Sequence, residues 1–146
     1  MSPAPTSCYE NHSAPPPNSL ENKSNNIKIA SADKYEDVNE LLAITDILVT
    51  DYSSIYKDFM LVDRPMIFIP YDYDEYKTEK GLLYDYFDTI PGPAVDSQKD
   101  FLNEVESAIK NDPYEDKRQE RCEVIHKHRD NQSSDRVAEL IESMVR

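Results

Sequence analysis

The stretch TDYSS at residues 50–54 follows a short β-branched run and precedes residues in helical spacing. Its two hydroxyls, Ser53 and Ser54, therefore lie where a strand is expected to end and a helix to begin. Helix starts carry free N–H groups and the positive end of the helix dipole, which suit phosphate oxygens. Asp58 follows Ser54 by one helical turn, where a carboxylate can accept both hydroxyls of a ribose. In this interpretation a phosphate and a sugar would both be bound by one helix.

The same residues also fit a purely structural interpretation. Asp51, Ser53 and Ser54 are of the types that cap helices, and a strand, a cap and a helix need no ligand. Asp58 is equally suited to a solvated helix face. Taken alone, these residues favour capping over phosphate binding, so the rest of the chain has to decide between the two.

Short apolar runs that alternate with helical patterns predict an α/β fold, a Rossmann-like parallel sheet flanked by helices. We expect strands at 27–29, 47–50 and 66–69. We expect helices at 33–44, 53–62, 99–110, 113–129 and 134–145. Between them, residues 70–97 predict a long loop-rich passage that holds both glycines, Gly81 and Gly92.

Composition divides the chain of 146 residues into two parts. Residues 1–26 are rich in Pro, Ser and Asn and predict a disordered lead, whereas residues 27–146 predict one folded domain. The formal net charge of −13 argues against nucleic acid as a partner, because phosphate backbones are bound by clustered Lys and Arg. No apolar run approaches the roughly 18 residues that a membrane-spanning helix needs. We expect a cytoplasmic protein.

The residue types that bind metals do not form a ligand set in this sequence. Cys8 and Cys122 are far apart and we expect both to be reduced thiols. His126 and His128 are two residues apart, which points them in different directions on a helix. We therefore expect no metal and no cofactor.

Four motifs follow one another in short spacing: TDILVTDYSSIYKDF at 45–59, DRPMIFIPYDYDEY at 63–76, KGLLYDYFDTIPGP at 80–93 and DNQSSDRVAELI at 130–141. Together they resemble the CDP-glycerol:poly(glycerophosphate) glycerophosphotransferase family, the teichoic acid primases and polymerases. The resemblance covers about Ile27 to the C-terminus. It implies a fold of two facing Rossmann-like domains, of the glycosyltransferase B (GT-B) type, in which this chain is part of the C-terminal, donor-binding domain.

The resemblance implies that Ser53 and Ser54 face the donor diphosphate and that Asp58 lies on its ribose side. Lys80 stands where the family usually has arginine; a lysine keeps the charge but loses the bidentate fork, so a phosphate ligand and a loop lysine in water both remain open. We expect two supporting residues, Asp51 and Gly81, the latter through a positive φ or a close approach to a ligand. The family's catalytic base lies upstream of this segment, so the sequence predicts no catalytic residue here.

The implied function is a CDP-glycerol or CDP-ribitol polyol-phosphate transferase of teichoic acid or capsular polymer biosynthesis, present as a donor-binding fragment. A missing domain would hold the membrane-linked polymer acceptor, at most placing the protein peripherally at the inner face of the membrane. We expect the isolated chain to be inactive. A non-catalytic remnant or partner module, and a fragment of a UDP-sugar glycosyltransferase, remain open as alternatives. The exposed edge of a partial sheet favours a homo-oligomer or a partner chain.

Several other residues of these motifs predict packing roles. Most of the tyrosines between residues 71 and 86 are expected to cover the sheet. Arg64 is expected to pair with Asp63 or Asp58, and Gly92 between two prolines to form a turn. Arg136 is expected to tie the last helix back to the sheet.

Overall fold

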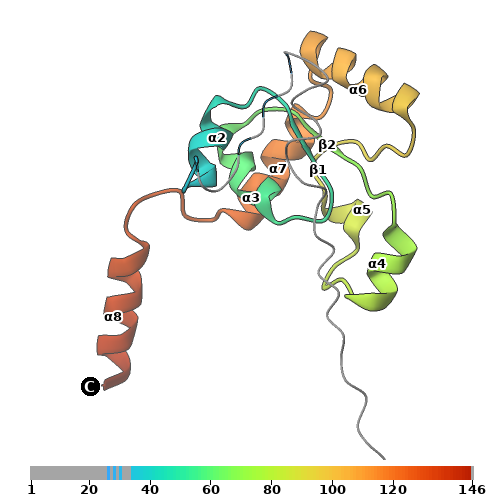
Figure 1. The fold of residues 1–146 in the computed structure, drawn as a ribbon. Coiled ribbons are helices and arrows are strands. Elements are labelled where there is room, and N and C mark those ends of the chain that lie inside the picture. Colours follow the sequence, from blue (N-terminus) through green and yellow to red (C-terminus); the bar gives the residue numbers. More distant parts are fainter. Residues whose placement is uncertain (1–25, 27, 29, 31–33, 146) are drawn as a thin grey trace, which may run out of the picture. The chain divides into compact units, whose positions relative to one another are not determined.

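The computed structural model describes residues 26, 28, 30 and 34–145 (Figure 1). The strand expected at 27–29 and nearly all of the lead expected at 1–26 lie outside the described residues, as do Cys8 and His12. The chain divides into a unit of residues 1–38 and a unit of residues 39–146. In the first unit the described residues are exposed, Lys34 and Tyr35 among them. The strands and the buried core belong to the second unit.

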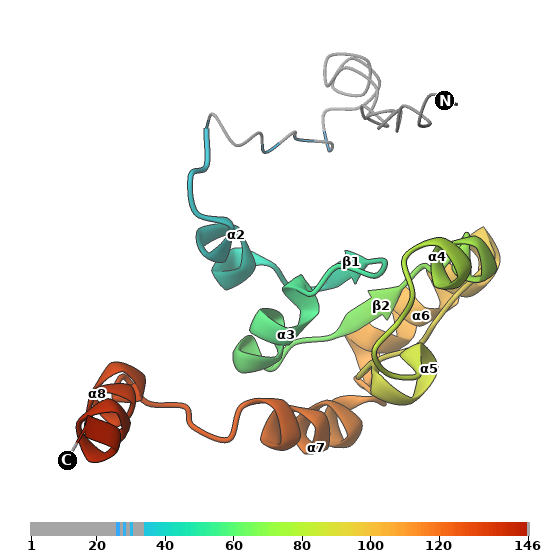
Figure 2. The ribbon, with the colours of Figure 1, turned by 90° about the horizontal axis from the view of Figure 1, so that it is seen from below.

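Two parallel strands form the sheet, β1 (Leu48–Thr50) and β2 (Met66–Phe68). The two strands lie side by side (Figure 2). Leu48 pairs with Met66 and Thr50 with Phe68. A single bridge from Phe68 to Ala94 continues the parallel pairing on the other side of β2. The small parallel sheet with its helices confirms the α/β part of the predicted fold class. All three residues of β2 are buried, as is typical of a strand covered on both faces.

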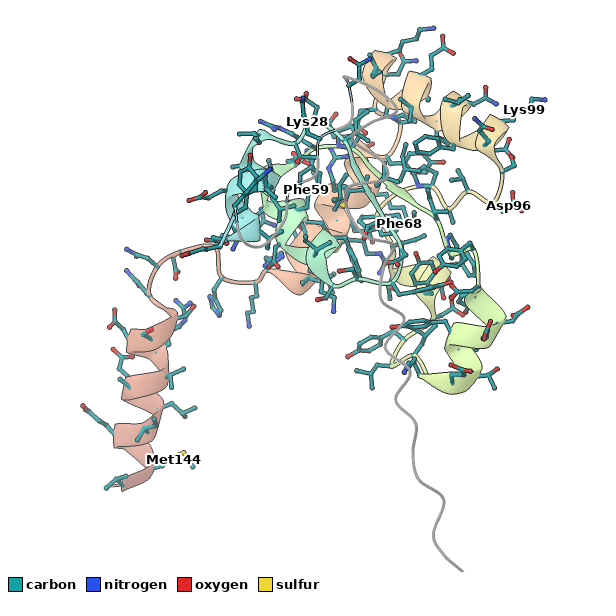
Figure 3. All side chains as sticks on the ribbon, in the orientation of Figure 1. Lys28, Phe59, Phe68, Asp96, Lys99 and Met144 are labelled. Carbon is teal, nitrogen blue, oxygen red and sulfur yellow. The ribbon has the colours of Figure 1, made fainter. Side chains whose placement is uncertain are left out.

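The connection between the two strands is helical, α3 (Ile55–Phe59) followed by the 3-10 turn η1 (Met60–Val62). Its apolar side packs on the sheet, and Phe59 from α3 and Phe68 from β2 are both fully buried (Figure 3). Burying a side chain of this size stabilises the fold by about 2–3 kcal/mol. These contacts fix the start of α3 at the end of β1.

Six further helices are present among the described residues: α2 (Val38–Ile44), α4 (Tyr73–Glu79), α5 (Tyr86–Thr89), α6 (Gln98–Lys110), α7 (Glu115–Ile125) and α8 (Ser133–Val145). In the described part of the chain, no helix is long and apolar enough to cross a bilayer. α6 and α8 match the predicted helices closely, whereas α2 and α7 are shorter than predicted.

The passage expected to be a loop at 70–97 contains both α4 and α5. The Asp85 carboxylate caps α5 by accepting hydrogen bonds from the N–H groups of Phe87 and Asp88. Tyr52 stacks on Tyr76 of α4 with ring centroids 4.0 Å apart, so packing outweighs the loop-like composition. Of the tyrosines, Tyr86 is buried, as predicted, but Tyr71 is 78% exposed.

Two arginines have partners other than those predicted. Arg64 donates to the backbone carbonyls of Ala43 and Thr45. It therefore has a structural role, but it holds the end of α2 instead of pairing with an acid. Arg136 donates to Asp130 and Ser133, which are close by in sequence, and among the described residues it has no hydrogen bond to the sheet. Both guanidinium groups satisfy nearby acceptors.

Gly92 is buried against β2. A Cβ at this position would lie 2.2 Å from the carbonyl oxygen of Met66, so close packing rather than a turn requires glycine. Because that neighbour is backbone, we expect Gly92→Ala to lower the free energy of unfolding by about 2 kcal/mol. Gly81→Asn is the control, since nothing lies within 4 Å of that Cβ and asparagine tolerates the φ of +72°. Urea unfolding measures the free energy of unfolding of both variants. An equal loss in the two would contradict the claim that close packing requires glycine at position 92.

Candidate functional site

The end of β1 is a hydrogen-bonded turn. The Asp51 carboxylate accepts from the Ser53 N–H at 3.1 Å, and the Ser53 hydroxyl accepts from the Ile55 N–H at 3.4 Å. The Tyr86 hydroxyl donates to the Asp51 carbonyl at 2.9 Å, which joins α5 to the turn. Asp51 and Ser53 thus have the local structural role that the capping interpretation predicted.

Ser54 differs from Ser53. It is the N-cap residue of α3, yet its hydroxyl makes no capping hydrogen bond. Ser54 instead lines a cavity of about 250 Å³, which we call the Ser54 cavity. The cavity is also lined by Lys57, Gly81 and the tyrosines Tyr52, Tyr56, Tyr84 and Tyr86. The structure therefore brings together two of the predicted site residues, Ser54 and Gly81.

Gly81 ends α4 and opens the loop to α5. Its φ of +72° is in the left-handed region, and its N–H donates to the Lys77 carbonyl at 3.2 Å. The positive φ predicted for Gly81 is confirmed, and this is the usual conformation of a residue just past a helix end. The turn places the following residues, from Leu82 to Tyr84, along the Ser54 cavity.

The structure leaves two predicted ligands outside this cavity. Lys80 and Asp58 are both exposed, and neither is among the residues that line the Ser54 cavity. The backbone N–H of Lys80 donates to the Tyr76 carbonyl at 2.9 Å, so the residue also closes α4. The phosphate role of Lys80 and the ribose role of Asp58 stay predictions.

A second cavity of about 450 Å³ adjoins the first, and we call it the Arg121 cavity. It shares Tyr56, Lys57, Tyr84 and Thr89 with the Ser54 cavity and adds Arg121, Val124 and Ile125 from α7. Neither of the two lining cations, Lys57 and Arg121, was predicted from the sequence. Lys57 follows Ser54 by three residues, a spacing that puts two side chains on one helix face and that was visible in the sequence.

The charged residues that line these two cavities are positive, whereas the chain as a whole is negative. The protein has 29 Asp and Glu against 16 Lys and Arg, yet no carboxylate is among the residues that line either cavity. Lys57 and Arg121 are their charged lining residues. Burial raises the pKa of Tyr52 and of Tyr86, and the carboxylates of Asp72 and Asp51 add to the rise for Tyr52. These two acids are therefore close to Tyr52, although neither lines the Ser54 cavity. The arrangement suits an anion.

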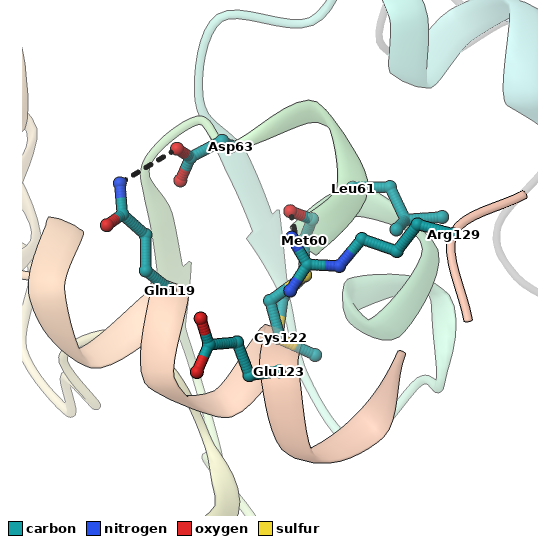
Figure 4. Close-up of a pocket in the computed structure, with 7 residues that line it drawn as sticks. All are labelled: Met60, Leu61, Asp63, Gln119, Cys122, Glu123 and Arg129. Carbon is teal, nitrogen blue, oxygen red and sulfur yellow. Dashed lines mark hydrogen bonds between the residues drawn. The ribbon is translucent and has the colours of Figure 1, made fainter. Parts of the chain in front are cut away.

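A third cavity, of about 230 Å³, provides a contrast (Figure 4). It is lined by Asp63 and Glu123 as well as by Arg129. Asp63 accepts hydrogen bonds from Arg118 at 2.7 Å and from Gln119 at 3.1 Å, so its carboxylate is already satisfied. With two acids and one arginine in its lining, this cavity has no excess of positive charge for an anion.

Metal binding has no support in the described part of the chain. Among residues 26, 28, 30 and 34–145, no group of three or more His, Cys, Asp or Glu is arranged to hold a metal ion. His126 instead makes a 2.7 Å hydrogen bond between its Nε2 and the Lys57 carbonyl, which fixes α7 beside α3.

Residues 12–143 match the sequence profile of the family described as CDP-Glycerol:Poly(glycerophosphate) glycerophosphotransferase. The chain belongs to this family. This confirms the resemblance seen in the four sequence motifs, and the match includes both cavities and the turn at the end of β1.

Two relatives of this glycerophosphotransferase family member are the teichoic acid poly(ribitol-phosphate) polymerase of Bacillus spizizenii and the teichoic acid glycerol-phosphate transferase of Staphylococcus aureus. The first is 42% identical over 55% of this chain and 12% of its own length. The second is 49% identical over 44% of this chain and 17% of its own length. The chain thus spans less than a fifth of either relative.

A solved structure is similar as well, that of the wall teichoic acid polymerase TagF, as a variant soaked with CDPG. The TM-score is 0.55 at 30% sequence identity, over 80% of this chain and 29% of the other. The α/β arrangement around β1 and β2 therefore recurs in a family member of known structure.

Proposed function

We propose that this chain is the donor-binding part of a CDP-glycerol or CDP-ribitol polyol-phosphate transferase in teichoic acid or capsular polymer biosynthesis. One observation carries the proposal: the Ser54 hydroxyl, not engaged in capping, lines a carboxylate-free cavity together with Lys57. Because the chain belongs to the glycerophosphotransferase family, we expect the ligand of that cavity to carry phosphate. In the same proposal, residues 27–146 are part of a Rossmann-like domain of a GT-B enzyme.

The donor diphosphate is placed in the Ser54 cavity. The Ser54 hydroxyl donates to a phosphate oxygen, and the Lys57 ammonium neutralises the charge as a point cation. The neutral phenols of Tyr52 and Tyr86 add no negative charge there. Ser53, Lys80 and Asp58 do not line this cavity, and their predicted contacts to the donor belong to the proposal. In the same proposal, Asp51 holds the turn.

The reaction in the complete enzyme is a substitution at phosphorus. A terminal hydroxyl of the growing polymer attacks the distal phosphorus of the donor, a new P–O bond forms, and the bond to CMP breaks. Positioning and charge neutralisation supply most of the catalysis in such transfers. The proton of the attacking hydroxyl passes to a base outside this chain, so we expect no turnover from the isolated protein.

Ser54→Ala is expected to weaken CDP-glycerol binding about tenfold, because a hydrogen bond to a charged group is lost. The melting temperature should stay unchanged, since the Ser54 hydroxyl caps nothing. Isothermal titration calorimetry with CDP-glycerol measures the affinity, and a UDP-sugar titrated in parallel tests the alternative donor.

Ser97→Ala is the matched control. Ser97 caps α6 by accepting from the Asp100 N–H, so its loss should lower the melting temperature and leave donor affinity unchanged. Ser53→Ala tests whether the second hydroxyl also contacts the donor. Preferential binding of the UDP-sugar, or full donor affinity in Ser54→Ala, would contradict the proposed function.

A further inference from the structure

Tyr86 is the first residue of α5, and its side chain reaches the turn at the end of β1. The side chain is 5% exposed, and its hydroxyl donates to the Asp51 carbonyl at 2.9 Å. Because the two residues are 35 positions apart, this bond joins two segments that are distant in the sequence. Both segments contribute to the Ser54 cavity, since Ser54 follows the turn and Tyr86 is in the same lining.

The ring of Tyr86 is held by aromatic neighbours from three parts of the chain. Its centroid is 5.2 Å from that of Tyr52 in the turn, 5.9 Å from that of Tyr73 in α4 and 6.2 Å from that of Phe68 in β2. Aromatic pairs at these separations attract one another. α5 itself has four residues, too few for a helix that is stable without such contacts. Packing of the ring therefore fixes the position of the hydroxyl.

The carbonyl that accepts this bond belongs to the residue that organises the turn. The Asp51 carboxylate accepts from the Ser53 N–H, and the Ser53 hydroxyl accepts from the Ile55 N–H. Both bonds are exposed, and the five residues of α3 are too few to fix the helix start by themselves. A donor that holds the Asp51 peptide group therefore also fixes the direction in which the following residues, Ser54 among them, leave the strand.

The Tyr86 hydroxyl is not available to the donor phosphates while it holds Asp51. A phenol has one proton to donate, and here the Asp51 carbonyl accepts it. The ordinary pKa of a tyrosine is about 10, and burial raises the pKa of Tyr86 further, so the proton stays on the phenol at pH 7. An ionised diphosphate offers acceptors alone. An effect of this hydroxyl on donor binding therefore has to pass through the turn.

We propose that Tyr86 is a positioning residue of the donor site, whose hydroxyl holds the Asp51 carbonyl and thereby orients Ser54 toward the donor phosphates. The proposal rests on the proposed function for the identity of the ligand. It makes α5 and the turn after β1 one unit, so that a change at position 86 reaches Ser54 through Asp51.

A double-mutant cycle, measured on the full chain by calorimetry with CDP-glycerol, tests this role. Tyr86→Phe removes the hydroxyl and keeps the ring, and it should weaken CDP-glycerol binding about fivefold. In the Ser54→Ala background the same substitution should change the affinity less than twofold, because the group that Tyr86 positions is gone. The melting temperature should change little, since Asp51 is exposed and water can replace the lost donor.

Tyr114→Phe is the matched control. Tyr114 is a partly buried tyrosine outside the lining of the Ser54 cavity. Its substitution should leave the CDP-glycerol affinity unchanged in both backgrounds.

The link between Tyr86 and the turn can also be measured without a donor. Exchange of the Ser53 backbone amide with water, followed by NMR, should be about fivefold faster in Tyr86→Phe, because Asp51, whose carboxylate accepts from that amide, is held less firmly. The same amide should exchange at the wild-type rate in Tyr114→Phe.

Unchanged CDP-glycerol affinity in Tyr86→Phe would overturn the proposal. Equal losses in the wild-type and Ser54→Ala backgrounds would also overturn it, because Tyr86 would then act independently of Ser54. If CDP-glycerol does not bind the wild-type chain, the proposed function fails and amide exchange alone decides whether Tyr86 positions the turn. Unchanged exchange of the Ser53 amide in Tyr86→Phe would overturn the positioning role in either case.

Discussion

Replacing Arg118 by methionine is expected to lower the free energy of unfolding by about 3 kcal/mol. The Arg118 side chain is 1% exposed and donates to Asp63 at 2.7 Å and to Asp112 at 2.8 Å. Both acids have a left-handed backbone, with φ of 53° and 40°, which residues other than glycine adopt at a cost. One guanidinium therefore joins the turn after η1 and the turn after α6 to α7.

Urea unfolding followed by circular dichroism measures this loss. Arg136→Met is the control, because the pair of Arg136 with Asp130 is at the surface and such pairs contribute less than about 1 kcal/mol. Methionine fills much of the space of arginine, so the loss of Arg118 tests the ion pairs more than the packing. A loss below about 1 kcal/mol in Arg118→Met would contradict the account of this network.

The same network predicts a pH dependence. Burial alone would raise the pKa of Asp63, but hydrogen bonds from Arg118 and Gln119 outweigh it and lower the pKa below its usual value. A carboxyl with a lowered folded pKa contributes stability above its unfolded pKa and loses it as the pH falls through the folded pKa. The wild type should therefore lose stability on acidification below about pH 4, and Arg118→Met should lose less.

Lys57→Glu is expected to weaken CDP-glycerol binding about 100-fold, which corresponds to about 2.7 kcal/mol. The substitution removes the cation shared by the two cavities and places a carboxylate beside the donor phosphates. Repulsion then adds to the lost attraction. The side chain of Lys57 forms no ion pair with a described residue, so the effect on stability should be small.

Calorimetry at 0.15 M salt measures this affinity, because charges farther away than about 8 Å are then largely screened. Lys99→Glu is the matched control, with the same change of charge on α6. Lys57→Arg should keep most of the affinity, since it keeps the charge. An equal loss in Lys57→Glu and Lys99→Glu would mean that net charge, rather than a site, controls binding.

Local patterns were enough to predict the strands and the turn between them. The apolar runs at 47–50 and 66–69 predicted β1 and β2, and helical spacing from Ser54 to Val62 predicted α3 with η1. Short apolar runs of this kind are typical of strands in a parallel sheet. Spacing did not show, however, that Ser53 is engaged in the turn while Ser54 is not, because the two hydroxyls are adjacent and of the same type.

Local sequence patterns could not predict contacts between residues that are far apart in the chain. α4 was missed because tyrosines and acids without a clear apolar stripe resemble a loop, whereas stacking of Tyr76 on Tyr52 holds the helix. Arg118 and Arg121 are three residues apart on a mostly charged helix, and nothing local distinguishes them. Only the fold shows that one contacts Asp63 and the other lines a cavity.

Titration of the ¹⁵N-labelled chain with CDP-glycerol, followed by backbone amide resonances, tests the central claim most directly. The account predicts that the largest shifts occur at Ser54, Lys57 and Gly81, which come from α3 and the loop after α4. It also predicts small shifts at Gln119 and Glu123 beside the cavity of Figure 4. Shifts that gather at that cavity instead, or no shifts at Ser54 and Lys57 with saturating donor, would contradict it.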